Sequence, residues 1–486
     1  MHVIGNVDRN AMLGERYGID FDLIPNIAMD IAVPWLARTM PLDLAGRVLL
    51  GACLVFTLLS VAFLHRTLFN QWSSTPLLAG LIVYHGSFMA GMVNFSLGIG
   101  LVPAALAVWI RLQRARTAWR LLIGSLMTLG LYLCHLVAVG AYGLLVIGYA
   151  LAITRDDGDH AAGRRPLFAE LATAAATGLL PLVLFLRIAL GQDAEGAPAG
   201  IVYGGVVWKL KALLSPLANY SLTLDLASFA LITGLALIAA RSGRLALDRR
   251  MVPGLLLLAL AFVLAPKALW TGGVFDQRLA VLLALMLIAS TRFSAPPTSW
   301  WQAASILLAL LFVLRIGVLT STWLDHRQDL AEMRRAIGLI EPGARLLVVR
   351  PDLKTAQRRA PERHRVFHHA VQLRSLPMLA LTERSAFVST IYALPGQQPL
   401  TLKPPYDRLG GRGHADLPTL EDLAAALAPG ADPATVSEQI RHWPSDFDYV
   451  LMLYGYGQGL DARTAGLPLK PLLDGRILEL FRIVER

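Results

Sequence analysis

The sequence contains little charge and almost no cysteine. Charged residues make up 16% of the 486-residue chain and hydrophobic residues 55%, whereas a soluble globular domain is about one-quarter charged. This is too little charge to cover the surface of a soluble protein of this length. The two cysteines, Cys53 and Cys134, lie inside apolar runs, which excludes a disulfide framework and a cysteine-based zinc site.

The sequence also lacks the motifs of common soluble enzymes. It contains no glycine-rich phosphate loop before a helix, no paired-histidine zinc motif and no serine elbow. The glycines at positions 98 and 100 lie within an apolar run, where glycine favours close helix packing. The sequence therefore indicates no metal site and identifies no cofactor.

The charge that is present is unevenly distributed. Residues 1–322 hold 23 Lys+Arg and 15 Asp+Glu, and residues 323–486 hold 21 and 19, which sum to the 44 and 34 of the whole chain. We therefore predict two domains, a transmembrane bundle over 1–322 and a soluble domain over 323–486. Of the net charge of +10, +8 lies in 1–322. Much of this charge is in short loops, which is typical of a topology signal and argues against nucleic-acid binding.

Ten apolar runs approach the length of about 20 residues that a membrane-crossing helix needs. They cover roughly 44–64, 77–93, 95–110, 119–134, 136–153, 167–189, 225–240, 251–266, 277–291 and 301–321. We expect breaks at Asn94 and at Cys134-His135. The predicted fold class is mainly α, a polytopic bundle of about ten transmembrane helices with a small C-terminal α/β soluble domain. In that domain, helical spacing over 325–340 and strand-like runs at 345–349, 447–453 and 477–483 give the mixed character.

The loop arginines give the bundle a direction. Loop 111–120 has four arginines and no acid, and loop 241–250 has four arginines and one aspartate. Both are expected to be cytoplasmic, and the four runs between them make that assignment consistent. Counting outward places segment 1–43 and the C-terminal domain outside, as expected for a multi-pass protein of a bacterial inner membrane. Segment 1–43 has no signal-peptide pattern, so either it crosses by itself or, as we favour, the chain lacks a first transmembrane helix.

Polar residues near the outer ends of the runs are the candidates for function, because such groups are costly in hydrocarbon. Candidate catalytic carboxylates are Asp22 and Asp30, and candidate substrate-binding residues are Asn94, His135, Arg187, Lys267, Asp276 and Arg278. Carboxylates facing cations suit an anionic lipid headgroup and a general base. Each group also has a structural explanation. The cations near run ends could snorkel to lipid phosphates, His135 could bond a neighbouring helix, and Asp276 could pair with Arg278.

Several short segments carry a resemblance to a group of bacterial multi-pass membrane proteins. The segments are 23–30 (LIPNIAMD), 94–98 (NFSLG), 134–136 (CHL), 265–267 (APK) and 272–278 (GGVFDQR). The overall plan is similar to that of GT-C-type glycosyltransferases, and the resemblance covers nearly the whole chain. It implies a sugar donor linked to a lipid phosphate and a key aspartate in the first outer loop after the first helix. We expect that helix to be missing here, and Asp20, Asp22 and Asp30 match that aspartate by position only.

Two hypotheses of function follow. The first is a membrane glycosyltransferase that uses a polyprenyl-phosphate sugar at the periplasmic face, with membrane lipids as its surroundings. The second is a non-catalytic multi-pass protein, either a transporter or an assembly partner in envelope polysaccharide synthesis. A transporter predicts helices broken near mid-membrane, and the glycine-rich run 86–100 is a candidate.

Overall fold

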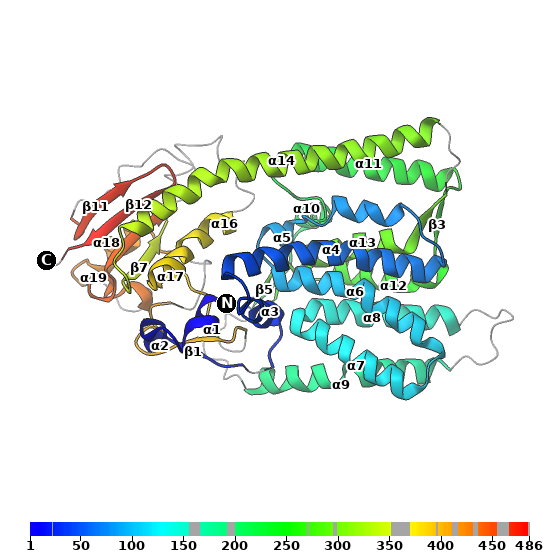
Figure 1. Cartoon of the computed structure of the whole chain (residues 1–486), viewed down its shortest axis with the longest axis horizontal. Coiled ribbons are helices and arrows are strands. Elements are labelled where there is room, and N and C mark those ends of the chain that lie inside the picture. The colour runs from blue at the N-terminus through cyan, green and yellow to red at the C-terminus, as the bar shows by residue number, and fades with distance from the viewer. Residues whose placement is uncertain are drawn as a thin grey trace. The chain divides into compact units, whose positions relative to one another are not determined.

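A computed structural model describes most of the chain. The described residues are 1–21, 23–154, 166–191, 200–269, 272–294, 299–350, 370–394, 397–410, 417–430, 436–453 and 466–484. They form two compact units, one made of Leu23–Gly317 and the other of Met1–Asp22 together with Val318–Arg486. Figure 1 shows the helices of the first unit and the strands of the second.

The first unit is a helix bundle, as predicted. Its longer helices are α4 (Leu42–Phe69), α6 (Val93–Arg111), α7 (Thr117–Cys134), α8 (Leu136–Thr154), α9 (Leu167–Gly191), α11 (Leu222–Arg241), α12 (Val252–Leu264), α13 (Phe275–Ser290) and the first part of α14 (Ser299–Gly338). Short helices α3 (Ala28–Leu36), α5 (Gly86–Met89) and α10 (Val206–Leu213) lie at one end of it (Figure 1). Among the described residues, seven helices are long and apolar enough to cross a membrane, namely α4, α6, α7, α8, α9, α11 and α14. The protein is thus a multi-pass membrane protein.

The remaining three of the ten predicted runs differ from a full span. Residues 77–93 do not form one helix: a 3-10 helix at Thr75–Leu81 is followed by an extended residue, His85, and by the four-residue α5. Three glycines in this stretch, at positions 80, 86 and 91, lower helix propensity, so the expectation of a continuous span there was wrong. Helices α12 and α13 have 13 and 16 residues, about 20 and 24 Å at 1.5 Å per residue.

Both expected breaks are present. Helix α6 begins at Val93, next to Asn94, and α7 ends at Cys134, with His135 extended at φ −172° and ψ 135° before α8 begins. A Cβ on Gly98 would lie 3.1 Å from Cβ of Ala138 and 3.2 Å from Cβ of Cys134. Glycine at 98 therefore allows α6 to approach the α7–α8 break closely, which confirms the packing role expected from the sequence.

The two arginine-rich loops lie at the same end of the bundle. Arg111 Nε donates to Thr67 Oγ1 at 3.0 Å, and Arg250 Nη2 donates to the carbonyl oxygen of Leu68 at 2.8 Å. Both acceptors lie in the last turn of α4. Near them, strand β3 (Leu245–Leu247) pairs antiparallel with β6 (Thr291–Phe293). This agrees with the even number of runs counted between the two loops.

The second unit contains a five-stranded mixed sheet in the order β11-β12-β10-β7-β8. Its strands are β7 (Arg345–Val349), β8 (Phe387–Val388), β10 (Tyr449–Leu453), β11 (Leu469–Asp474) and β12 (Leu478–Ile483). Strand β7 is parallel to β8 and β10, whereas β12 is antiparallel to β10 and β11. Helices α16 (Ala370–Ser375), α17 (Leu379–Arg384), α18 (Leu420–Ala426) and α19 (Trp443–Asp446) complete the α/β domain.

The N-terminal residues belong to this second unit, whereas the charge distribution along the sequence predicts that they belong to the bundle domain. Helices α1 (His2–Asn6) and α2 (Ala11–Arg16) lead into β1 (Tyr17–Ile19), which pairs antiparallel with β9 (Leu400–Leu402). Leu13 and Tyr17 are fully buried in the apolar core of the unit. This long-range pairing is the reason for the difference, because composition along the chain carries no information about it.

Candidate functional site

Asn94 holds the start of helix α3 against the start of α6. Its Oδ1 accepts a hydrogen bond from the backbone N–H of Met29 at 2.8 Å, and its Nδ2 donates to the carbonyl oxygen of Asn26. Asp30 lies one residue beyond Met29 and is 7% exposed. Burial raises the pKa of the Asp30 carboxyl, and a hydrogen bond with Asn94 works against that rise. Asp30 and Asn94, both predicted site residues, are thus brought together.

His135 and Arg278 meet on the other side of the first turn of α6. Arg278 Nη1 lies 2.9 Å from His135 Nε2, and both side chains are buried, at 8% and 9% exposed. Phe95, next to Asn94, contacts both. Its ring centroid lies 5.3 Å from that of His135 and 5.5 Å from the guanidinium carbon of Arg278. The four predicted residues Asp30, Asn94, His135 and Arg278 therefore gather around one helical turn.

Two hydrogen-bond donors, the Arg278 guanidinium and the backbone N–H of Val137, converge on the His135 ring. The backbone N–H of Val137 donates to His135 Nδ1 at 3.1 Å. A neutral imidazole has one acceptor nitrogen, so the ring can accept from Arg278 at Nε2 or from Val137 at Nδ1, but not from both. One of the two donors therefore lacks an acceptor on this ring, whichever nitrogen carries the proton. An oxygen anion bound at Arg278 would supply the missing acceptor.

Arg278 also differs from two other buried arginines of the bundle. Arg120 makes two bonds to the Glu170 carboxylate at 2.7 and 2.6 Å, and Arg315 bonds Asp225 at 2.9 Å. Within the described part of the chain, Arg278 has no carboxylate partner. Its Nη2 donates to the sulfur of Met92 at 3.4 Å and its Nε has no partner.

Asp276 is fully buried but does not pair with Arg278. Its Oδ1 accepts from Trp208 Nε1 at 3.2 Å, and its Oδ2 lies 3.2 Å from Lys209 Nζ. The geometry at Oδ2 is too poor for a hydrogen bond, so Asp276 and Lys209 interact chiefly through charge. Asp276 is held by α10 and is poorly placed to act on a substrate. Its two partners were missed because nothing in the sequence of residues 206–213 relates them to the start of α13.

The remaining predicted residues are spread over the molecule. Lys267 is half-buried, and its Nζ lies 4.2 Å from the centroid of the Trp208 ring. Arg187 is exposed on α9, which favours the snorkelling explanation. Asp22 lies outside the described residues.

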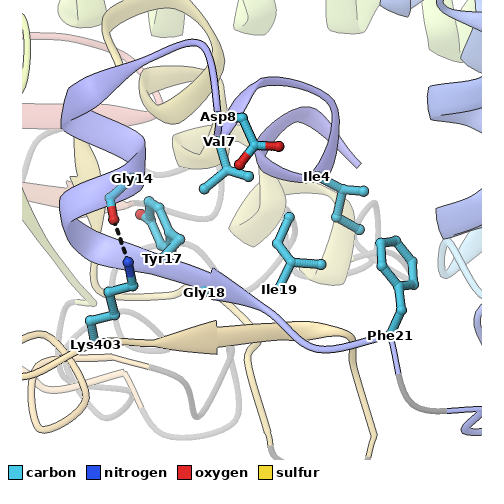
Figure 2. Close-up of a pocket in the computed structure, with 9 residues that line it drawn as sticks. All are labelled: Ile4, Val7, Asp8, Gly14, Tyr17, Gly18, Ile19, Phe21 and Lys403. Carbon is cyan, nitrogen blue, oxygen red and sulfur yellow. Dashed lines mark hydrogen bonds between the residues drawn. The ribbon is translucent and has the colours of Figure 1, made fainter.

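The second unit has a pocket of about 390 Å³ formed by its N-terminal segment and Lys403 (Figure 2). Ile4, Val7, Ile19 and Phe21 supply apolar walls. Lys403 Nζ donates to the carbonyl oxygen of Gly14 at 2.7 Å, which ties the strand pair β1–β9 to helix α2. The Tyr17 hydroxyl is buried and has no hydrogen-bond partner among the described residues. The charged side chains of the lining, Asp8 and Lys403, are exposed, so they are not held in a desolvated site. The pocket is therefore a weaker candidate than the Arg278 cluster.

Comparisons with known proteins give one structural likeness. No protein-family model matches the chain, and no curated protein matches it. The chain is similar to the crystal structure of ArnT from Cupriavidus metallidurans bound to undecaprenyl phosphate, with a TM-score of 0.46 and 12% identity over 99% of this chain and 93% of that one. The case for function rests on the residues described above.

Proposed function

We propose that the protein transfers a sugar from a lipid-phosphate-linked donor at the extracytoplasmic face of a bacterial inner membrane. The observation that carries this proposal is the buried Arg278 guanidinium, which has no carboxylate partner among the described residues and competes with the Val137 N–H for one acceptor on His135. A phosphate oxygen accepting from Arg278 would neutralise the guanidinium, and the His135 ring could then accept from Val137 and donate its Nε2–H to the same phosphate. Arginine suits this role because its planar fork matches phosphate geometry.

In the proposed reaction, a hydroxyl oxygen of the acceptor attacks the anomeric carbon of the sugar. The bond between that carbon and the phosphate oxygen breaks, and its electron pair leaves with the phosphate. Arg278 and His135 stabilise the charge that grows on the leaving phosphate. The Asp30 carboxylate takes the proton of the attacking hydroxyl, for which a pKa raised by burial is suitable.

Binding of undecaprenyl phosphate, the lipid bound in the similar ArnT structure, tests the anion site. We expect Arg278→Met to weaken binding by purified protein about 10- to 100-fold, because hydrogen bonds to charged groups contribute roughly 1.5–3 kcal/mol. The matched control is Arg66→Met. Arg66 bonds Asn70 and contacts the Trp72 ring at the far end of α4, and its replacement should leave the affinity unchanged. Equal affinity of the Arg278 variant and the wild type would refute the assignment.

One observation favours transport as a second function. The stretch from residue 75 to Val93 is interrupted at His85 and again at Gly91 and Met92, and interrupted helices line substrate paths in transporters. Solute flux in proteoliposomes with no covalent product would support transport. Label transferred from a radiolabelled polyprenyl-phosphate sugar to an acceptor would support the transferase.

A further inference from the structure

The segment that contains β2 (Ile201–Val202) and α10 has an unusual outer surface. Val206, Val207 and Leu210 are 77%, 67% and 58% exposed. Together with Leu213 they occupy positions i, i+1, i+4 and i+7, which form one face of a helix. The preceding residues Ile201, Val202 and Tyr203 are also exposed. An apolar surface therefore runs along the whole segment.

The inner face of α10 carries the polar contacts. Lys209 Nζ donates to the carbonyl oxygen of Phe262 at 2.9 Å and to that of Ala265 at 2.5 Å, and it also lies beside Asp276. Trp208 bonds the same carboxylate, and Ala212 is fully buried. The helix thus points Lys209 and the indole N–H of Trp208 at the protein and its large aliphatic side chains away from it. This is the reverse of the pattern on the surface of a water-soluble protein.

The length of α10 excludes a transmembrane role. Eight residues rise about 12 Å, well short of the roughly 30 Å hydrocarbon core of a bilayer. Its Lys209 bonds tie it to the C-terminal end of α12, whose Val263 and Leu264 are 63% and 62% exposed. Lys209 bonds the residues on either side of Val263 and Leu264, so the exposed aliphatic end of α12 lies beside α10, at the bundle end that also holds α3 and α5 (Figure 1).

We propose that β2 and α10 form a membrane-docked segment, with the lipid surface as its partner and Val206, Val207 and Leu210 among the acyl chains. The adjoining face of α12 argues for lipid as the occupant, because the seven long apolar helices place the bundle in a bilayer. The exposed Lys211 fits this placement, since a lysine at the edge of an interfacial helix extends its ammonium group to the headgroups. The proposal does not depend on the transferase function.

Docking in lipid would also affect the anion site. Asp276 stands in the first turn of α13, two residues before Arg278. Trp208 and Lys209 hold that turn from the inner face of α10. A lipid-held α10 would therefore fix the start of the helix that carries Arg278.

Nitroxide labels on the full chain in phosphatidylcholine–phosphatidylglycerol nanodiscs test the proposal. Labels are placed at Val207→Cys and Leu210→Cys, with Leu260→Cys on the exposed face of α12 as the lipid reference and Glu421→Cys, at an exposed position of α18, as the water reference. Both native cysteines are buried, so we expect little labelling of them. The unmodified chain, treated with the same label, measures this background. Relaxation by oxygen and by a water-soluble nickel chelate is compared at each site.

We expect labels at 207 and 210 to resemble the Leu260 reference, with strong relaxation by oxygen and weak relaxation by nickel. Strong nickel relaxation, as at the Glu421 site, would place the face in water and overturn the proposal. Weak relaxation by both agents would show that protein, such as a second copy of the chain, covers the face, and would also overturn it. Absence of sugar transfer by the unlabelled chain, with the relaxation ratios as expected, would count against the transferase function and leave the docking intact.

Discussion

The cost of burying Arg278 is the central physical fact at the scale of single residues. An uncompensated cation in a membrane-spanning bundle is destabilising by several kcal/mol. The rings of Phe95 and Phe275 recover part of this cost, with their centroids 5.5 and 5.4 Å from the guanidinium carbon. A bound anion would recover more of this cost. A buried arginine without a carboxylate partner therefore marks a binding site better than Arg120, which already has such a partner.

The proposed role of Asp30 predicts the pH dependence of transfer. A general base acts only when deprotonated, and burial raises the pKa of this carboxyl. We therefore expect activity to rise with pH through a value above the ordinary pKa of an aspartate, about 3.9. Asp30→Asn should lower kcat by about 10²- to 10⁴-fold, while binding of undecaprenyl phosphate should persist. An assay of labelled product across pH would measure the loss in kcat and the pH dependence, and a separate binding assay would measure the affinity.

Asp43 offers a matched control for Asp30. It is exposed in the first turn of α4, so Asp43→Asn should change neither kcat nor the pH profile. If Asp30→Asn kept the full rate, Asp30 would not be the base.

At the scale of elements, helix α10 joins the ends of α12 and α13. Lys209→Met removes both hydrogen bonds to the end of α12 and leaves the Asp276 carboxylate, which is fully buried, without its cation. Breaking a buried ion pair costs about 3–5 kcal/mol, and the 20% exposure of the Lys209 side chain places this case at the lower end. Thermal unfolding in detergent should therefore shift to lower temperature.

Two further variants serve as controls for that shift in unfolding temperature. Lys209→Arg keeps the charge and should recover part of the stability. Lys470→Met, at an exposed position on β11, should leave unfolding unchanged. If Lys209→Met melted like the wild type, α10 would not hold the two helix ends together.

At the scale of the whole molecule, the arginine-rich loops predict which side of the membrane each part faces. Cysteines introduced at Arg114 and Arg244 should resist a membrane-impermeant maleimide added outside spheroplasts, because positive loops stay in the cytoplasm. A cysteine at Lys470 should react. Labelling of Arg114→Cys and Arg244→Cys on opposite sides would contradict the even number of crossings between the loops.

The helices and their breaks could be predicted from local sequence. Long apolar runs produce α4, α6, α7, α8, α9, α11 and α14, and the extended residue His135 separates α7 from α8 as expected. The interruption of the helix within residues 77–93 was not predicted, because hydropathy measures apolar content and does not detect where the backbone leaves the helix. The tail strands 345–349, 447–453 and 477–483 were predicted to within two residues at either end.

The sequence by itself determined that this chain is a multi-pass helix bundle with a charged α/β domain, because composition and run length are local properties of the chain. Only the tertiary structure decided which polar residues meet. It turned Asp276 toward Lys209, placed Arg278 against His135 and paired residues 17–19 with residues 400–402. Those contacts join segments up to several hundred residues apart, and packing, which no local pattern encodes, brings them together.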